Sequence, residues 1–354
     1  MPNLFEICFD YGAGFHPSER AYVVSNCFLL LFVSPVVCVV GLILNLACLF
    51  VFLASRRRCS SLVPYLATLC TFDAVQLVIP LCVFTAPAYL EHTTVPETHW
   101  IAQLANYSVV FLYPVMMMAN YGSIWVITLI CFERYRAVCH PLANRSQQTR
   151  RANPRRRAGM LLAGVTVFAV LINVIRFFEY DWVLEPRCRE NCSQTLLMIR
   201  GQTPMAQDWT YDLVQDQIVY PLLFYFAPLI LLSLWSSRIL VTIYQARRYF
   251  AKAACSNGGE LRSSACRQRK EHRSAFMILA IVVLFFVCHT GGMVLRFIRP
   301  ALPPTDDPEA LEEYFNSLPY FQLCGDISNL LFHVNCACDP LIYFLFTKNF
   351  RDLR

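Results

Sequence analysis

The chain has 354 residues, of which 56% are hydrophobic and only 15% are charged. Soluble domains carry about 25% charged residues, so this composition excludes a water-soluble globular protein and an intrinsically disordered chain. The apolar residues gather in seven long blocks, and each block is long enough for the ~20 residues that a helix needs to cross a bilayer. The blocks leave no segment large enough for a separate soluble domain.

We predict membrane helices within residues 21–54, 62–90, 103–138, 158–178, 213–244, 274–298 and 318–346. A membrane strand would alternate with a period of two over ~10 residues, and these blocks do not. The sequence therefore predicts an all-α membrane protein. It has a short N-terminal segment over 1–20, a seven-transmembrane helix bundle over 21–346, and a short amphipathic helix over 347–354 that lies on the inner membrane face. Prolines inside the spans predict bends or loosened turns at Pro80, Pro87, Pro114, Pro221, Pro228 and Pro340.

Lysine and arginine gather in alternate loops, namely 56–58, 145–157 and 262–273, and again after the last block. By the positive-inside rule these loops face the cytoplasm, which places residues 1–20 outside a multi-pass protein of the cell membrane. Residues 1–20 lack the apolar core of a cleavable signal peptide, so we expect the first span to act as a signal anchor. The topology already requires these basic runs, so they predict no nucleic-acid partner. Most acidic residues fall on the outer side and are expected to attract cationic ligands.

The three N-glycosylation sequons lie at different predicted positions relative to the membrane. Asn144 lies on the cytoplasmic side and Asn106 lies close to the membrane, so we predict a glycan only at Asn191. Most of the 17 cysteines lie in apolar blocks, where a thiol behaves as a small hydrophobe. Four cysteines lie on the oxidising outer side and can pair in three ways, which the sequence leaves open: Cys8, Cys188, Cys192 and Cys324.

Two short motifs end predicted helices at their inner side. Glu133-Arg134-Tyr135 ends the third block, and Asp339-Pro340-Leu-Ile-Tyr343 lies near the end of the seventh. Four other spans carry Asn45, Asp73, Pro228 and the run Phe285-Phe-Val-Cys288. Taken together, these features closely resemble rhodopsin-like (class A) G-protein-coupled receptors over essentially the whole chain. The run from Ser123 to Tyr135 is most similar to invertebrate FMRFamide-type neuropeptide receptors.

The resemblance implies a receptor in which Arg134 contacts a heterotrimeric G protein and Tyr343 moves inward on activation. Arg134 at a membrane boundary also needs an anion, and Glu133 and Glu271 are available. Breaking such a pair would free the arginine, which suggests a two-state element in which the third and sixth spans separate and expose an inner cleft for a cytoplasmic partner. The alternative is a static pair that only fixes topology. We assign coupling and switching to Glu133, Arg134, Tyr135, Glu271, Asp339, Pro340 and Tyr343.

Asp73 is an acid in the middle of a span, where ionisable groups are rare and usually functional. The resemblance implies a sodium ion held by Asp73, Ser123, Asn335 and Asp339, whose oxygens suit a hard cation. The alternative is a hydrogen-bonded polar core with a protonated Asp73. Asp339 replaces the family's commoner asparagine, so two acids lie near one site. We predict no other cofactor.

Two ligand classes are excluded by single positions. Met116 stands where amine receptors carry an aspartate, and His333 stands where opsins carry the retinal-binding lysine. Soft apolar walls with a few hydrogen-bond formers suit a peptide end or a small amphipathic molecule, and acids of the loop 179–212 could receive an arginine of a basic, FMRFamide-like peptide. The predicted ligand-binding residues are Gln76, Met116, Asn120, Glu179, Asp181, His289, Met293, Arg296 and Asn329.

Several positions depart from the family pattern. Val109 stands where the family usually has the cysteine that ties the third span to the outer loop, so this disulfide cannot form. His289 and Gly291 replace a usual tryptophan and proline, so the usual bend of the sixth span is altered. Alternative functions are a chemosensory or orphan receptor of the same fold, or a transporter, although we find no internal repeat. No nucleophile–base arrangement or phosphate loop is present, so we predict no enzyme activity.

Overall fold

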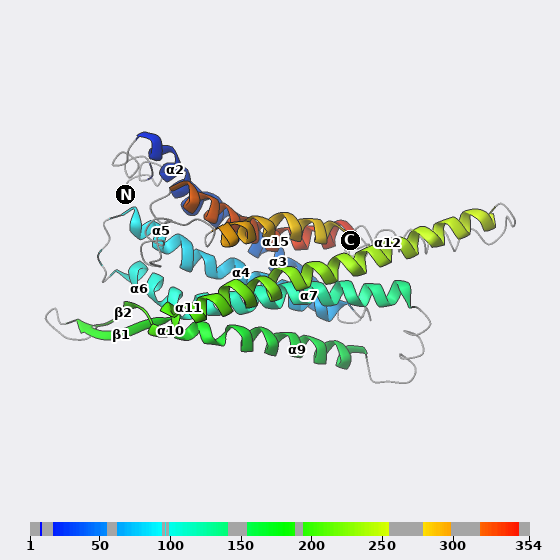
Figure 1. Ribbon diagram of the computed structural model, residues 1–354, viewed down its shortest axis with the longest axis horizontal. Helices are drawn as coiled ribbons and strands as arrows, with labels where there is room; N and C mark the ends of the chain where they lie inside the picture. Colours follow the sequence, from blue (N-terminus) through cyan, green and yellow to red (C-terminus); the bar gives the residue numbers. More distant parts are fainter. Residues whose placement is uncertain are drawn as a thin grey trace.

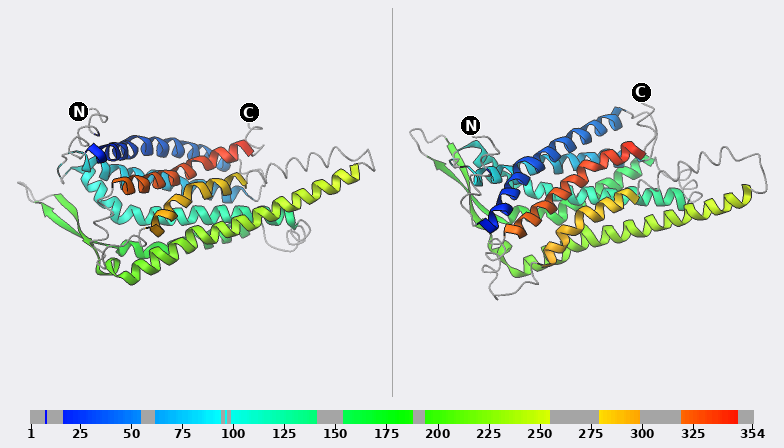
Figure 2. Two further views of the ribbon diagram at one scale, coloured as in Figure 1. Left: turned by 45° about the horizontal axis from the view of Figure 1, so that its top comes forward. Right: turned by 90° about the horizontal axis from the view of Figure 1, so that it is seen from above.

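The computed structural model describes residues 8, 17–54, 62–93, 96, 99–140, 154–187, 194–254, 279–298 and 319–346. These residues form a bundle of long helices with a two-stranded sheet at one end (Figure 1). Within the described part, six helical segments are long and apolar enough to cross a membrane: Tyr22–Ala54, Val63–Glu91, Trp100–Cys139, Arg156–Phe178, Trp209–Ala246 and Leu279–Ile298. A further helix, α15 (Pro319–Phe346), lies in the same bundle (Figure 2) and is more polar, because it carries Asp326, His333 and Asp339.

Most spans are built from more than one helical segment. The first contains α2 (Pro17–Phe28), η1 (Leu29–Val33) and α3 (Ser34–Ala54). The second contains α4 (Val63–Pro80), η2 (Leu81–Thr85) and α5 (Ala86–Glu91), and the third α6 (Trp100–Tyr107), η3 (Ser108–Leu112) and α7 (Tyr113–Cys139). The fourth is α9 (Pro154–Asn173) with the 3-10 turn η4 (Val174–Phe178). The fifth follows α10 (Pro204–Gln207) and consists of α11 (Trp209–Tyr211), η5 (Asp212–Val219), η6 (Pro221–Phe226) and α12 (Ala227–Ala254). The sixth is the helix Leu279–Ile298. The predicted amphipathic helix 347–354 lies outside the described residues.

Five of these segments, η1, η2, η3, η5 and η6, are π-helical, and each ends two residues before a proline. A proline has no N–H for the carbonyl four residues earlier, and its ring clashes with that carbonyl, so the preceding turn widens. The bends predicted at four of the prolines thus take the form of π turns, whereas Pro80 and Pro340 lie within α-helices. The prolines that follow the π turns are Pro35, Pro87, Pro114, Pro221 and Pro228.

In four of the five π turns, the carbonyl five residues before the proline accepts a hydrogen bond from a side chain of another helix. No water is available for such a carbonyl in a bilayer, so the neighbouring helix has to supply the donor. We call these four hydrogen bonds the proline braces. They are Thr85 Oγ1 to the Leu30 carbonyl (3.3 Å), Ser108 Oγ to Cys82 (2.9 Å), Trp125 Nε1 to Leu223 (3.1 Å) and Arg296 Nη1 to Asp216 (3.3 Å).

Small residues let the helices at the centre of the bundle approach closely. A Cβ atom on Gly41 would lie 2.6 Å from the Cβ of Ala337, so α3 and α15 touch at this point. Next to it, the side-chain amide of Asn45 donates to the carbonyl oxygens of Gly41 and Cys336, each at 3.0 Å. This contact fixes α15 against α3 beside the polar core described below.

The strands β1 (Tyr180–Arg187) and β2 (Gln194–Gln202) form an antiparallel hairpin that the sequence did not predict. A bulge interrupts the pairing between Asp181 and Trp182, and Gly201 opposite Asp181 has a φ of 136°, a conformation that favours glycine. We call this end of the bundle the hairpin end, and the opposite end, where Glu133, Arg134 and Tyr135 lie, the motif end. At the motif end α12 extends beyond its neighbours (Figures 1 and 2).

Cys8 forms a disulfide with Cys27 of α2. This corrects the sequence prediction, which placed the partner of Cys8 among Cys188, Cys192 and Cys324 because Cys27 falls inside the first apolar block. The helix α2 begins at Pro17, so Cys27 lies near the hairpin end rather than deep in the span. Cys324 is an exposed free thiol. Cys188 and Cys192 lie outside the described residues.

Candidate functional site

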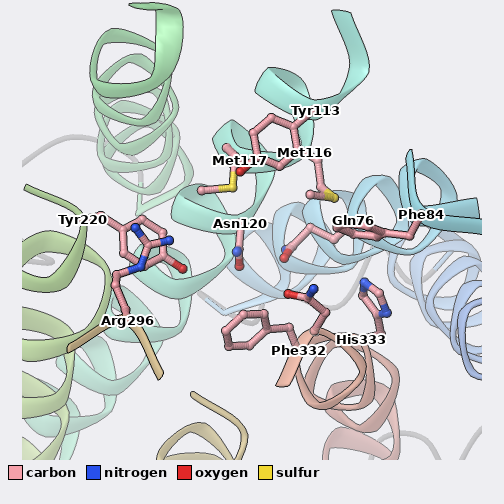
Figure 3. A pocket seen from close by; sticks show the side chains of 11 residues that line it. Gln76, Phe84, Tyr113, Met116, Met117, Asn120, Tyr220, Arg296, Phe332 and His333 are labelled. Carbon is pink, nitrogen blue, oxygen red and sulfur yellow. The ribbon is translucent and has the colours of Figure 1, made fainter. Parts of the chain in front are cut away.

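A cavity of about 180 Å³ lies between the helices in the half of the bundle nearer the hairpin (Figure 3). Its walls are methionine and aromatic side chains, with three side-chain amides and one guanidinium group among them. Such a mixture is typical of a small-molecule or peptide site. The residues that line it are Gln76, Phe84, Tyr113, Met116, Met117, Asn120, Tyr220, Arg296, Asn329, Phe332 and His333.

Five of the nine predicted ligand residues line this cavity, namely Gln76, Met116, Asn120, Arg296 and Asn329. The sequence prediction missed Tyr113, Phe332 and His333, although each lies three or four residues from a predicted lining residue and so on the same helical face. Phe84 and Tyr220 lie in or beside π turns, where the face of a helix cannot be read from a regular 3.6-residue period.

Among the described residues that line the cavity, Arg296 is the one lysine, arginine, aspartate or glutamate. Its guanidinium carbon lies 4.2 Å from the ring centroid of Tyr220, a cation–π contact. Its Nη1 contacts the carboxylate of Asp216 at 3.2 Å and donates to the backbone carbonyl of the same residue at 3.3 Å. The guanidinium group is thus held from one side by a ring, a carboxylate and a carbonyl oxygen, and it stands at the cavity wall (Figure 3).

A network of ion pairs continues from Arg296 to the base of the hairpin. Arg176 is only 4% exposed, and its two terminal nitrogens contact Glu179 at 3.0 Å and Asp216 at 2.9 Å. The Tyr211 hydroxyl also donates to Glu179, at 2.7 Å. Burial raises the pKa of the Glu179 carboxyl, while the charge of Arg176 and the bond from Tyr211 oppose this rise. Glu179, predicted as a ligand residue, is therefore engaged inside the protein, and Asp181 is exposed on β1.

The predicted ligand residues His289 and Met293 are buried, with 2% and 3% of their surface exposed, and neither lines the cavity. The imidazole of His289 stacks on Phe285, with ring centroids 4.3 Å apart, and lies 4.9 Å from the ring of Phe332. Its Nδ1 lies 2.9 Å from the carbonyl oxygen of Phe285, which indicates a proton on Nδ1. Because Phe332 lines the cavity, His289 contacts the wall from behind.

A polar core lies around Asp73, which is fully buried. Ser123 donates to Asp73 Oδ1 at 2.6 Å, whereas Asp73 Oδ2 and both carboxyl oxygens of Asp339 have no hydrogen-bond partner among the described residues. Asn335 is buried as well, at 4% exposure. Orphaned buried oxygens are the atoms that a hard cation or a proton would satisfy, so the donor set fits the predicted ion. In the described part of the chain, no three or more His, Cys, Asp and Glu residues cluster as metal ligands.

At the motif end, Glu133 contacts Arg157 of α9 at 3.0 Å and Arg136 at 3.9 Å. Arg134 next to it is half-buried, and its Nε is buried without a hydrogen-bond partner among the described residues. The predicted pairing of Glu133 with Arg134 is therefore absent from the described contacts, and Glu271 lies outside the described residues. The Tyr135 hydroxyl lies 3.1 Å from Nε2 of His140. Asp339 and Pro340 are buried in α15, which also carries Tyr343.

The predicted glycan site Asn191 lies outside the described residues.

Comparison with known proteins accounts for this combination of a cavity and a distant motif. Residues 44–343 match the family of 7 transmembrane receptors (rhodopsin family). The chain is 25% identical to the FMRFamide peptide receptor frpr-18 of Caenorhabditis elegans and 25% identical to the FMRFamide receptor of Drosophila melanogaster, over 90% of this chain in each case. It spans 66% and 51% of the lengths of these two relatives. It is also 25% identical to lysophosphatidic acid receptor 5 of Bos taurus, over 91% of this chain and 77% of that receptor. The chain belongs to the rhodopsin family of seven-transmembrane receptors.

Proposed function

We propose that the protein is a cell-membrane receptor that binds an extracellular peptide at the hairpin end and activates a heterotrimeric G protein at the motif end. The observation that carries this proposal is the cavity lined by amides, methionines and Arg296 in a chain whose relatives include two FMRFamide receptors. The basic residues Arg134, Arg136, Arg156 and Arg157 at the motif end support a cytoplasmic location of that end.

Arg296 supports a specific polarity for the ligand. A cation at the cavity wall favours an oxygen acceptor, such as a peptide carbonyl or a carboxylate, and disfavours an ammonium group. Asp216 does not offset this preference fully, because it also pairs with Arg176. The part of the ligand that enters the cavity therefore presents an oxygen acceptor to Arg296.

The proposed peptide carries its positive charge on the part that stays outside the cavity. Asp181, Asp208 and Asp212 are exposed at the hairpin end and can attract basic side chains. A peptide with basic residues near a carboxy-terminal amide satisfies both conditions, with its carbonyl oxygen on Arg296 and its guanidinium group near these acids. This arrangement agrees with a cationic, FMRFamide-like ligand.

The test is G-protein activation in cells that express the chain, challenged with a panel of amidated basic peptides and the matching free acids. We expect an active peptide to lose roughly tenfold or more in potency on Arg296→Ala and clearly less on Arg296→Lys, which keeps the charge. Arg134→Ala is expected to abolish the response while peptide binding persists. A silent panel at confirmed surface expression would contradict the peptide assignment.

A second candidate ligand is an anionic lysophospholipid. It is favoured by the same cation in the cavity and by the similarity to a lysophosphatidic acid receptor. The two candidates separate in the same assay, because a phosphate ligand needs no exposed acid at the hairpin end. Activation by lysophosphatidic acid, unchanged in Asp208→Asn and Asp212→Asn variants, would support the lipid; activation by a basic peptide that these variants weaken would support the peptide.

A further inference from the structure

The strand β2 is fastened to the outer part of the third span by two side chains of α6. Gln103 Oε1 accepts a hydrogen bond from the backbone N–H of Leu197 at 2.8 Å, and Asn106 Nδ2 donates to the carbonyl oxygen of the same residue at 3.0 Å. Gln103 and Asn106 are three residues apart and so lie on one helical face. Both backbone polar groups of a single residue are thus satisfied from one side of one helix.

The hairpin presents this residue to α6 for a geometric reason. In an antiparallel pair, a strand residue whose N–H and C=O point away from its partner strand leaves both groups unsatisfied at an edge. Leu197 is paired with Leu184 of β1, and its own N–H and C=O go to α6 instead. The side chains of Leu196 and Leu197 are 5% and 0% exposed, so apolar burial accompanies the two bonds.

A second attachment lies at the base of the hairpin. The N–H of Thr203 donates to the carbonyl oxygen of Glu179 at 2.9 Å, and its hydroxyl donates to the carbonyl oxygen of Phe178 at 2.7 Å. The side chain of Glu179 in turn joins Arg176, which contacts Asp216. The position of the hairpin is thus coupled through this chain of contacts to Asp216 and Arg296 at the cavity wall.

We propose that Gln103 and Asn106 are positioning residues that hold the outer loop in place of a disulfide between the loop and the third span. No cysteine lies between Cys82 and Cys131, so the third span has no thiol near its outer end. The two-bond attachment to Leu197, which we call the amide clamp, fixes the same pair of elements without one. The orientation of the hairpin is therefore insensitive to reductant.

The amide clamp also involves the asparagine of a glycosylation sequon, Asn106. A glycan is attached through Nδ2, and in this protein Nδ2 donates to Leu197. The hydroxyl of the third sequon residue, Ser108, is fully buried and shares its one proton between the carbonyl oxygens of Cys82 and Ala105. The folded receptor thus engages the side chains of both Asn106 and Ser108, and we expect Asn106 to stay unmodified.

The direct test is hydrogen–deuterium exchange of the full chain in lipid nanodiscs, followed in peptides that cover residues 194–202. We expect dithiothreitol to leave exchange at Leu197 unchanged. Gln103→Met, which keeps the shape but removes the acceptor, is expected to speed exchange roughly tenfold, whereas Gln103→Glu, which keeps an acceptor, restores protection. The same pattern is expected for the potency of an activating ligand at unchanged surface expression.

Two controls keep the result decisive. The double variant Cys8→Ser, Cys27→Ser lacks the disulfide between these two residues, so any effect of reductant on it must come from another disulfide. The dithiothreitol experiment on the wild-type chain does not depend on the folding of any variant. Faster exchange over 194–202 with dithiothreitol in that double variant would show that a disulfide holds the hairpin, and unchanged exchange in Gln103→Met would show that the clamp does not; either result overturns the proposal. For the sequon, Asn191→Gln is expected to abolish the endoglycosidase shift, and a residual shift would place a glycan on Asn106.

Discussion

Glu133 is ion-paired with Arg157 of the following span, with 3.0 Å between Arg157 Nη2 and Glu133 Oε1, and not with its chain neighbour Arg134. The pair ties the motif ends of α7 and α9 together and leaves Arg134 outside the contact. The side chain of Arg157 is 38% exposed and that of Glu133 is 14% exposed, so we expect a modest pair energy of roughly 0.5–1 kcal/mol. A pair of this strength can exchange partners during activation.

Arg157→Gln tests this competition. Without Arg157, Glu133 keeps only the longer contact with Arg136 and can turn to Arg134, which would occupy the group proposed to contact the G protein. We expect ligand-independent G-protein activation to fall about two- to fivefold, as a bias of roughly 0.5–1 kcal/mol implies. Arg156→Gln is the matched control, because Arg156 is exposed and makes no described contact. Basal activity equal to or above wild type would contradict this role for Arg157.

The proline braces predict a coupling between Trp125 and Pro228. Trp125→Phe removes the indole N–H together with part of the ring and leaves the Leu223 carbonyl without its donor, so we expect the lost hydrogen bond to contribute about 1 kcal/mol to a decrease in unfolding free energy. Pro228→Ala supplies a backbone N–H that can satisfy the helix internally. In the Pro228→Ala background the cost of Trp125→Phe should therefore shrink, which a double-mutant cycle of denaturation in detergent measures.

Trp235→Phe serves as the control for that cycle, because Trp235 packs on Phe132 at 5.0 Å between ring centroids and makes no described hydrogen bond. It should show no coupling to Pro228. Equal costs of Trp125→Phe with and without the proline would mean that the Leu223 carbonyl does not depend on the indole.

Removal of Arg176 is expected to be the most damaging single change at the hairpin end. Arg176→Met leaves the half-buried Glu179 without its cation and Asp216 with Arg296 alone, and breaking a fully buried pair typically costs about 3–5 kcal/mol, so we expect a loss toward the lower end of that range. Arg176→Lys should recover only part of this loss, because an ammonium group cannot bond two carboxylates in the same planar geometry. Thermal unfolding of the purified receptor measures both; a loss no larger than that of Arg157→Gln would refute a structural role for the network.

The orphaned oxygens of Asp73 and Asp339 predict a response to sodium. We expect thermal stability to rise when sodium chloride replaces choline chloride at constant ionic strength, because an ion that binds the folded state stabilises it by mass action. Asp73→Asn should abolish this response and Asp339→Asn, which keeps an amide oxygen, should weaken it, whereas Asp212→Asn, exposed at the hairpin end, should keep it. A sodium response that survives both core variants would favour the alternative of a protonated, ion-free core.

Apolar length was sufficient to predict the helical spans, because a bilayer accepts little besides continuous helix. Helical spacing was sufficient for Gln76, Asn120 and Asn329, since these residues lie in regular helix and face the cavity. It did not predict Tyr220, which lies between two π turns that rotate the following residues away from a regular period.

Ion pairs were the hardest contacts to predict where a residue from another part of the chain replaces the expected partner. Glu133 has Arg134 beside it in the chain, and only the packing of α9 against α7 shows that Arg157 takes its place. Glu179 looked available to a ligand because the sequence does not reveal that Arg176 turns back to it. The hairpin was missed for a related reason, since β2 is fastened through Leu197 to side chains 91 and 94 positions away.

The proline braces also bear on how the chain is assembled in the membrane. A helix that enters the bilayer with a widened turn carries a carbonyl without a partner until the donor helix stands beside it. The first span receives its donor, Thr85, from the second, and the second receives Ser108 from the third. The fifth finds Trp125 already in place and then gains Arg296 from the sixth. Successive insertion thus satisfies each exposed carbonyl within one or two steps, so that biogenesis in chain order favours correct neighbours.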